Sequence, residues 1–315
     1  MDLPVNSSET RRVATDPLAA FNRWFPDPRL FQIAFLGLLL AAGVWFRDFS
    51  LAWGQIVLCF AAALTTQRLI DTLTPSNPRS YRSALITALS LTLLLRADNL
   101  WAHPLAGCAA ISSKFLFRFR GKHLFNPANL GVIFALLCLH GTWVSPGQWG
   151  QDIALAGWLV VLGTVVTRKA RRDDVSWTFL AFYLGAIACH VVWLGQRWAV
   201  WDHQLSSGAL LLFAFFMISD PMTAPNAWRG RIVHAGLVAF IGYFCLFELH
   251  RTNTLLWALF FAAFAVPLWD LLWPAEKFEW NTQGDKHENS LKTQTPNARS
   301  TGRITPRVLH GRRAA

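Results

Sequence analysis

Two polar stretches interrupt an otherwise apolar chain and contain the residues best suited to chemistry. The first, residues 112–131, reads SSKFLFRFRGKHLFNPANLG and places Lys122 and His123 shortly before Asn126 and Asn129. Asn-Pro is typical of a helix start, with Asn126 as the N-cap and the proline at the first helical position. The free N–H groups and positive dipole of such a helix end favour a phosphate or carboxylate of a cofactor. The alternative is a positively charged loop before a well-capped helix.

The second stretch, residues 219–226, reads SDPMTAPN and follows a long apolar run. It contains Asp220 and Thr223. An ionisable side chain at membrane depth costs roughly 2.5–3.5 kcal/mol, which favours a role for Asp220 in an ion path or at a cofactor. At the membrane surface the same aspartate would only cap a turn. Asp270, in the last apolar run, is expected near the cytoplasmic interface.

Several kinds of function are excluded by pattern. The sequence contains no nucleophile–base–acid arrangement, P-loop or dinucleotide fingerprint, so no catalytic residue is assigned. The five cysteines lie in apolar segments without metal-type spacing, so no metal site is expected. The net charge of +11 comes from basic residues that alternate with apolar blocks, which argues against nucleic acid as a partner.

The composition indicates an integral membrane protein. Of the 315 residues, 53% are hydrophobic and only 15% are charged, whereas soluble domains average about 25% charged residues. The mean hydropathy is +0.32, and the 16 tryptophans suit the membrane–water interfaces. The lipid bilayer is therefore the first partner.

Apolar runs between polar breaks divide the chain into ten candidate membrane segments. They are residues 30–46, 51–66, 83–95, 99–112, 129–142, 152–167, 176–195, 207–219, 231–248 and 252–273. With the N-terminus in the cytoplasm, 25 of the 29 Lys and Arg residues lie on the inner side. The positive-inside rule predicts this asymmetry, so both termini are expected in the cytoplasm of a bacterial inner membrane protein.

The segments repeat. The first, second, third and fifth begin 122 to 125 residues before the sixth, seventh, eighth and tenth, and the remaining pair is shifted by 132 residues. Because five is an odd number, the second copy must enter from the opposite face. The sequence therefore predicts an all-α membrane protein of two inverted five-segment repeats, an architecture common among transport folds.

The third segment of each repeat is short. Ser83–Leu95 and Ser207–Ser219 have 13 residues each and cover about 20 Å of a hydrocarbon core of about 30 Å. Each begins with serine and a small residue, which places Ser207 and Gly208 at a close-packed entrance. Each ends near an aspartate, Asp98 or Asp220, and both aspartates are candidates for an ion path. Such paired half-spans indicate a central site. Ordinary short helices in a locally thinned bilayer are the alternative.

These boundaries define four regions: a cytoplasmic N-terminal tail (1–28), a first membrane half (29–150), a second membrane half (151–275) and a basic C-terminal tail (276–315). The last region is polar, rich in Asn, Thr, Gln, Lys and Arg, and without periodicity. Such a composition predicts disorder.

The two polar stretches resemble motifs of the RnfD/NqrB family, membrane subunits of ion-pumping NADH:ferredoxin and NADH:quinone oxidoreductase complexes. The resemblance rests on KHLFNPAN from Lys122 to Asn129, on Ser207-Gly208-Ala209, and on SDPMT from Ser219 to Thr223. It covers roughly residues 30–275. It implies an inverted-repeat bundle that holds flavin and assists Na⁺ or H⁺ movement, with other membrane or periplasmic subunits as partners. It also implies a subunit that is non-catalytic or holds a redox cofactor.

One feature departs from the family pattern. The resemblance implies FMN on a threonine in a long insert between the fifth and sixth spans, but here that connection runs only from about Gly141 to Gln151. The nearest similar stretch, Ser207-Gly208-Ala209-Leu210, has leucine where threonine is needed. Covalent FMN is therefore not expected, and non-covalent flavin is left open. Short relatives without this loop are similar to UnbU-type proteins of enediyne biosynthesis clusters.

Two further functions stay open from the residues alone. The paired half-spans would also suit a stand-alone transporter or channel, and the chain could be a membrane anchor for a biosynthetic pathway of the enediyne type. Flavin in the purified protein would favour the redox subunit, and solute flux in liposomes would favour the transporter. Partners that co-purify without either would favour the anchor.

Overall fold

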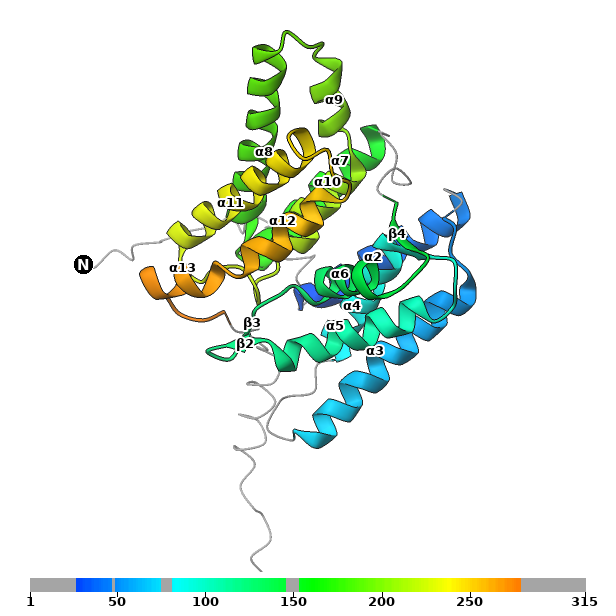
Figure 1. The fold of residues 1–315 in the computed structure, drawn as a ribbon. Coiled ribbons are helices and arrows are strands. Elements are labelled where there is room, and N and C mark those ends of the chain that lie inside the picture. Colours follow the sequence, from blue (N-terminus) through cyan, green and yellow to red (C-terminus); the bar gives the residue numbers. More distant parts are fainter. Residues whose placement is uncertain (1–26, 47–48, 75–80, 146–152, 279–315) are drawn as a thin grey trace, which may run out of the picture. The chain divides into compact units, whose positions relative to one another are not determined.

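A computed structural model describes residues 27–46, 49–74, 81–145 and 153–278 (Figure 1). The predicted N-terminal tail up to residue 26 and the predicted disordered tail from residue 279 lie outside the described residues. The described part is helical, as the sequence predicts, and a helix coincides with each of the ten predicted segments.

The described residues of the first half form five helices and four short strands. The helices are α2 (Pro28–Phe46), α3 (Trp53–Leu73), α4 (Tyr81–Leu94), α5 (Ala102–Leu116) and α6 (Pro127–Cys138). The strands β1 (Leu95–Ala97) and β4 (Thr142–Val144) pair antiparallel, with Leu95 opposite Val144. The strands β2 (Arg118–Phe119) and β3 (Lys122–His123) form a hairpin between α5 and α6.

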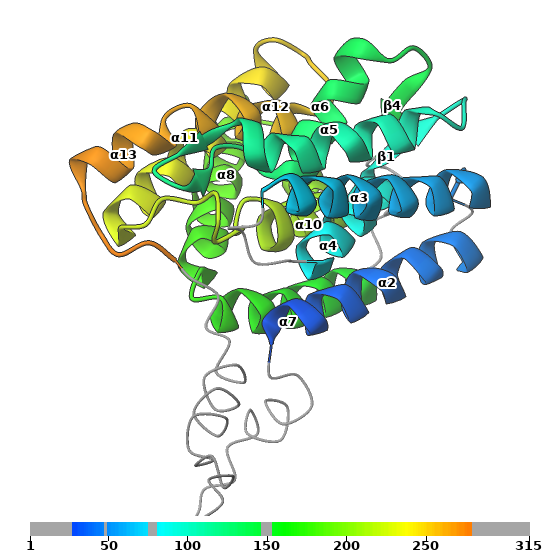
Figure 2. The ribbon, with the colours of Figure 1, turned by 90° about the horizontal axis from the view of Figure 1, so that it is seen from below.

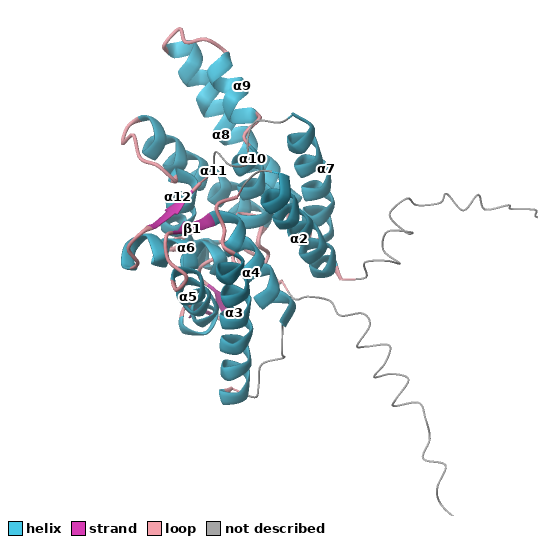
Figure 3. Ribbon diagram, turned by 90° about the vertical axis from the view of Figure 1, so that its right-hand side faces the viewer, coloured by secondary structure: helices cyan, strands magenta, loops and turns pink. Residues whose placement is uncertain are grey.

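The second half contains the remaining helices. These are α7 (Ile153–Lys169), α8 (Asp173–Trp193), α9 (Ala199–Leu205), α10 (Gly208–Leu212), the π-helical turn η2 (Phe213–Met217), α11 (Trp228–Phe247), α12 (Thr254–Ala263) and α13 (Val266–Leu272). The predicted eighth segment is thus α10 with η2, and the tenth is α12 with α13. The short helix α9 was not predicted; it lies beside α8 (Figure 3).

Helix length and composition agree with a multi-pass membrane protein. Four described helices, α2, α3, α8 and α11, are long and apolar enough to cross a membrane. The bent pair α12–α13, with 46° between its parts, would make a fifth. The helices α4 and α6 and the segment α10–η2 are apolar but shorter than a full span. The short lengths of α4 and of α10–η2 match the two expected half-spans.

Each half packs in the same order. In the first, α3 contacts α4 and α5, α5 contacts α6, and α2 contacts α4. In the second, α8 contacts η2 and α11, α11 contacts α12, and α7 contacts α10 and η2. The helices α2 and α7 lie side by side, and α6 touches α12 (Figure 2). The sequence-distant α6 and α12 thus meet between the halves.

Small side chains permit the close approach of helices in the core. Cys59 and Ala63 of α3 and Ala106 and Ala110 of α5 are fully buried. A Cβ atom on Gly131 of α6 would lie 2.8 Å from the Ala106 carbonyl oxygen, closer than carbon and oxygen can approach. Such contacts are typical of membrane helices, which associate mainly through packing rather than through the hydrophobic effect.

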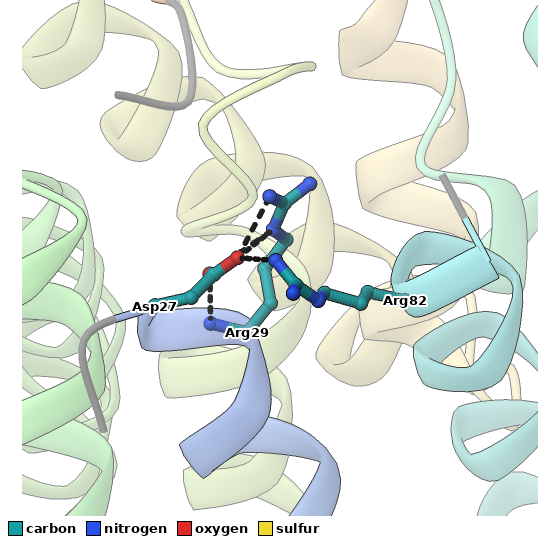
Figure 4. A network of polar contacts seen from close by, with 3 residues as sticks. All are labelled: Asp27, Arg29 and Arg82. Carbon is teal, nitrogen blue, oxygen red and sulfur yellow. Dashed lines mark hydrogen bonds and ion pairs between the residues drawn. The ribbon is translucent and has the colours of Figure 1, made fainter. Parts of the chain in front are cut away.

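The start of α2 is tied to the start of α4 by charge. The Asp27 carboxylate accepts hydrogen bonds from the Arg29 backbone and guanidinium and forms an ion pair with Arg82, as the sticks in Figure 4 show. Both ends belong to regions that the sequence places on the cytoplasmic side.

Candidate functional site

The predicted helix start at Asn126 is confirmed. The Asn126 side-chain oxygen accepts a hydrogen bond from the Asn129 backbone N–H at 3.1 Å, and a proline occupies the first turn of α6. The asparagine satisfies an N–H group that has no partner within the helix. Pro127 lacks an N–H, but an N–H in the first turn has no partner within the helix, so the proline removes no helical hydrogen bond.

The nitrogen of the Asn126 side-chain amide joins the two polar stretches. Its Nδ2 donates to the Met217 carbonyl oxygen at 3.2 Å and lies 3.4 Å from a carboxylate oxygen of Asp220. The two motifs are 94 residues apart in sequence between Asn126 and Asp220. The structure therefore brings the FNPAN and SDPMT motifs into direct contact.

The second half-span begins and ends where the sequence predicts. The Ser207 side chain caps α10 by accepting from the Leu210 N–H, and Gly208 is buried in the first turn. The segment continues as the π-helical turn η2, a conformation that is frequent at functional sites. The buried residues of α10 and η2 pack against α7 and α8 rather than facing lipid. This burial argues against an ordinary short helix in thinned bilayer.

The ends of the two half-spans carry opposite charges. After α4, the buried Arg96 donates to the carbonyls of Thr92 at 2.9 Å and Leu95 at 2.7 Å, so a cation covers the negative end of that helix. After η2 comes a carboxylate, that of Asp220, which accepts from the Met222 N–H at 3.0 Å. An acidic group at a helix C-terminus is unfavourable without positive or N–H partners.

Asn129 makes a second link across the halves. It is almost fully buried, and its Nδ2 donates to the Leu256 carbonyl oxygen of α12 at 3.1 Å. Its side-chain oxygen has no hydrogen-bond partner among the described residues. A buried amide oxygen without a partner is costly, so it marks a position where a water or a cation would be stabilised.

A cavity of about 880 Å³ lies beside this junction. It is lined by Met217 and Leu256, whose carbonyl oxygens accept the hydrogen bonds from Asn126 and Asn129. Ser207 and Leu94 line it too, and the half-spans α10–η2 and α4 thus face the same space. The other lining residues include Trp143, Tyr183, Leu210, Phe213 and Arg251.

On the other side of the junction, Lys122 forms a buried ion pair. Its ammonium lies 2.8 Å from the Asp270 carboxylate of α13 and also donates to the Asn226 side chain at 3.2 Å. The second Asp270 oxygen accepts from the Asn226 N–H at 2.8 Å. Burial lowers the pKa of Lys122, and the hydrogen bond and charge of Asp270 oppose that shift. The ammonium expected at a cofactor is thus already engaged by protein groups.

Asp270 and Asn226 belong to this network although the sequence did not assign them. Asp270 is buried within the protein. The only signal in the sequence was an isolated aspartate within an apolar run. Asn226 also accepts, through its carbonyl, from Arg231, whose guanidinium pairs with Asp174 of α8 at 2.6 Å.

His123 and Thr223 have local partners. The His123 Nδ1 atom lies 3.0 Å from the Lys114 carbonyl oxygen. Burial, together with the nearby charges of Lys114 and Arg118, lowers the pKa of His123 to about 4, so the ring is neutral at pH 7. The Thr223 hydroxyl donates to the Asp220 carbonyl oxygen and stabilises the turn after η2.

Asp98 lies apart from these residues. It is exposed, and its N–H donates to the Gly141 carbonyl oxygen just beyond the end of α6. Asp220 contacts the start of the same helix through Asn126. With 12 residues, α6 separates the two aspartates by about 18 Å along its axis.

The fold and the site define a helical, multi-pass membrane protein with a buried polar junction where the start of α6 meets the end of η2. Residues 139–279 match the model of the NQR2, RnfD, RnfE family. The chain is also similar to the RnfD component of the ion-translocating oxidoreductase complex of Pseudomonas paraeruginosa, with 26% identity over 259 residues that cover 62% of this chain and 73% of the relative. The same component of the Escherichia coli complex is 23% identical over 313 residues, covering 73% and 87%. The resemblance to the RnfD/NqrB family is thereby confirmed.

Proposed function

We propose that this chain is an ion-conducting membrane subunit that works with other membrane subunits of an electron-transfer complex. The observation that carries the proposal is the junction at Asn126, where the start of α6 meets the end of η2. Asp220 lies at that junction, and a large cavity opens beside it. Broken helices whose ends meet in the protein interior are the usual setting of ion sites in transport proteins.

Ten spans in two inverted repeats form part of the proposal, with halves at residues 29–150 and 151–275. The same packing order in both halves supports it. So does the burial pattern: the buried residues of α3 recur in α8 at a constant shift of 120 residues. They are Gln55, Cys59, Ala63, Gln67 and Asp71 in α3 and Val175, Phe179, Tyr183, Ile187 and Val191 in α8.

Contacts between loops support the proposed topology, with both termini in the cytoplasm of a bacterial inner membrane. The Lys122–Asp270 pair and the hydrogen bond from Lys277 to the Gly121 carbonyl each join two regions assigned to the inner side. The hydrogen bond from Asp98 to Gly141 joins two outer regions. An error in the number of spans between these regions would have placed partners on opposite faces, whereas the choice of the cytoplasmic side rests on the distribution of Lys and Arg.

Cysteine labelling tests this topology. In a chain whose native cysteines are replaced by alanine, a cysteine at the exposed Arg197 should react with a membrane-impermeant maleimide added to intact cells. A cysteine at the exposed Arg120 should react only after the membrane is opened. The opposite result at either position would refute the arrangement.

The cavity fits a flavin ring held without a covalent bond. A volume of about 880 Å³ lies within the range of about 300–1,000 Å³ typical of small-molecule sites. Trp143, Tyr183 and Phe213 supply aromatic wall, and Arg251 supplies a positive charge. Leu210, which follows the Ser207-Gly208-Ala209 stretch, also lines the cavity and offers no hydroxyl for covalent attachment. A bound flavin would supply one- and two-electron chemistry to the complex.

The absorbance spectrum of the purified full-length chain tests the cofactor assignment. Flavin absorbance should be present in the folded protein and lost to the filtrate on denaturation. Leu210→Trp, which fills the cavity, should abolish it, and Leu205→Trp, outside the cavity, should not. A fluorescent protein band on a denaturing gel would show covalent attachment, and a folded chain without flavin would exclude this cofactor.

A stand-alone channel is the second candidate, because the cavity and Asp220 would serve a solute path equally well. In this case the purified chain in liposomes should pass ions without any partner subunit. Flux that is absent from the chain alone and appears with partners would favour the complex.

A further inference from the structure

The cavity beside the Asn126 junction has an exposed rim and a buried floor. Trp143, His203 and Arg251 line it and are exposed, and each belongs to a different connection between helices. Leu210 of α10 and Met217 of η2 line it as well, but they are almost fully buried. The exposed residues therefore mark the side from which a ligand enters, and the buried residues mark the interior end of the cavity.

The three connections that form the rim lie on the same side of the proposed topology. They follow the fifth, seventh and ninth predicted segments and therefore face away from the cytoplasm. The Lys122–Asp270 pair, by contrast, joins two regions assigned to the inner side. In this topology the cavity opens to the outer side of the membrane, opposite the basic stretch that precedes α6.

Arg251 brings a positive charge to this rim. Its backbone N–H donates to the Cys245 carbonyl oxygen, but its guanidinium has no hydrogen bond or ion pair among the described residues. No aspartate or glutamate of the described ranges lines the cavity, and Asp202 and Glu248, which are near in sequence, are exposed. The start of α12 at Thr254 turns the positive end of the helix dipole towards the same rim. A negatively charged group would therefore be stabilised there.

The lining changes from polar to apolar between the rim and the floor. Gln204 and Asn253, both half-buried, add amide groups beside the exposed rim residues. Leu210 and Phe213 are almost fully buried and offer only apolar surface. A matching ligand is amphipathic, with a flat apolar ring inside and an acidic group at the rim. Phosphate suits Arg251 best, because a guanidinium can donate two parallel hydrogen bonds to it.

We propose that the cavity takes up a phosphorylated aromatic ligand from the outer side of the membrane, with the ring against Phe213 and the phosphate at Arg251. This inference rests on the proposed flavin site. It makes Arg251 the residue that selects FMN over riboflavin, which has the same ring system but no phosphate. A phospholipid headgroup offers the same phosphate without an aromatic ring, so it would be recognised by Arg251 alone.

Titration of the purified full-length chain, freed of bound flavin by dialysis, with FMN and with riboflavin tests the phosphate site. Quenching of flavin fluorescence gives each dissociation constant. FMN should bind about tenfold or more tightly than riboflavin, as expected for a hydrogen bond between charged groups. Arg251→Gln should remove this preference by weakening FMN binding alone, and Arg251→Lys should keep part of it. Added salt should weaken the binding of FMN and leave that of riboflavin unchanged.

Arg197→Gln is the matched control for Arg251→Gln. Arg197 is an exposed arginine of the same proposed side that does not line the cavity, so its replacement should change neither dissociation constant. Because Arg251 is itself exposed, its replacement should leave the chain folded.

The reaction of a cavity cysteine with charged methanethiosulfonates tests the entrance without any flavin. In a chain whose native cysteines are replaced by alanine, Ala209→Cys places a thiol on the cavity wall. An anionic and a cationic reagent, both membrane-impermeant and similar in size, should reach this thiol in intact cells. Arg251→Gln should lower the ratio of the anionic to the cationic rate about threefold or more, because it removes a positive charge beside the path. Added FMN should protect the thiol more strongly than riboflavin does.

The outcomes distinguish this inference from the flavin assignment on which it rests. A rate ratio that depends on Arg251 in a chain that binds no flavin would exclude the cofactor and keep the anion entrance. Equal binding of FMN and riboflavin, or an equal loss of both in Arg251→Gln, would overturn the phosphate site and leave the flavin. A folded chain whose Ala209→Cys thiol does not react from outside would overturn entry from the outer side. Protection of the thiol in nanodiscs of phosphatidylglycerol but not of phosphatidylcholine, without added flavin, would assign the site to a lipid and overturn the soluble ligand.

Discussion

Replacing Asn126 tests the junction most directly, because one side chain performs two separate tasks. Its oxygen caps α6, and its Nδ2 joins α6 to η2 through the Met217 carbonyl. Loss of an N-cap costs about 1 kcal/mol. Leaving the Met217 carbonyl without its partner in a buried position costs about 1–3 kcal/mol more. Asn126→Ala should therefore lower the free energy of unfolding by about 2–4 kcal/mol.

Asn126→Ser separates the two contributions. Serine is as good an N-cap as asparagine but too short to reach Met217, so this variant should lose only the cross-chain contribution of about 1–3 kcal/mol. For a chain of this length 1 kcal/mol corresponds to roughly 2–4 °C in melting temperature. Tryptophan fluorescence of the detergent-solubilised protein during heating would measure the shifts.

The expected order of melting temperatures is native, then Asn126→Ser, then Asn126→Ala. Asn99→Ala is the matched control, because Asn99 also accepts from backbone N–H groups at a helix start but is exposed. It should cost about 1 kcal/mol or less. If Asn126→Ala and Asn99→Ala melt together, the junction between α6 and η2 contributes nothing to stability, and the argument for a rigid central site is wrong.

Three further predictions concern the surrounding polar groups. Lys122→Ala and Asp270→Ala should each destabilise the fold by about 3–5 kcal/mol, because each leaves a buried charge without its partner. Exchanging both residues for leucine should cost much less. A double variant whose cost equals the sum of the two single costs would argue against the pair. His123 has a pKa lowered to about 4 from an ordinary value near 6.5, so the folded state binds fewer protons between these values, and its contribution to stability is complete above pH 6.5 and lost as pH falls towards 4. The melting temperatures of the native chain and of His123→Gln should therefore differ at pH 7 and approach each other near pH 4. A difference that stays constant with pH would contradict the lowered pKa of His123. Asp220→Asn should keep the melting temperature within a few degrees, since the amide can still accept from Met222, but should abolish ion movement by the reconstituted complex; full activity would remove Asp220 from the ion path.

The sequence alone determined the class of protein and the position of its helices. Apolar runs of about 13 to 22 residues can bury their backbone polar groups in lipid only as helices, so composition and charge asymmetry were enough to locate all ten segments. The start of α6 was also predictable from the local sequence, because Asn126 and the proline after it act on the backbone immediately beside them. The family resemblance rested on the same short motifs.

Only the tertiary structure decided which polar groups meet. The pairs Lys122 with Asp270, Asn126 with Met217 and Asn129 with Leu256 all join elements that are far apart in sequence. The distances between these partners depend on how closely the helices pack through their small residues, and no local sequence pattern specifies that packing. From the sequence, Asp270 and Lys122 were expected to carry charge at the inner side of the membrane. Their burial, and hence the cost that makes them informative, came from the surrounding helices.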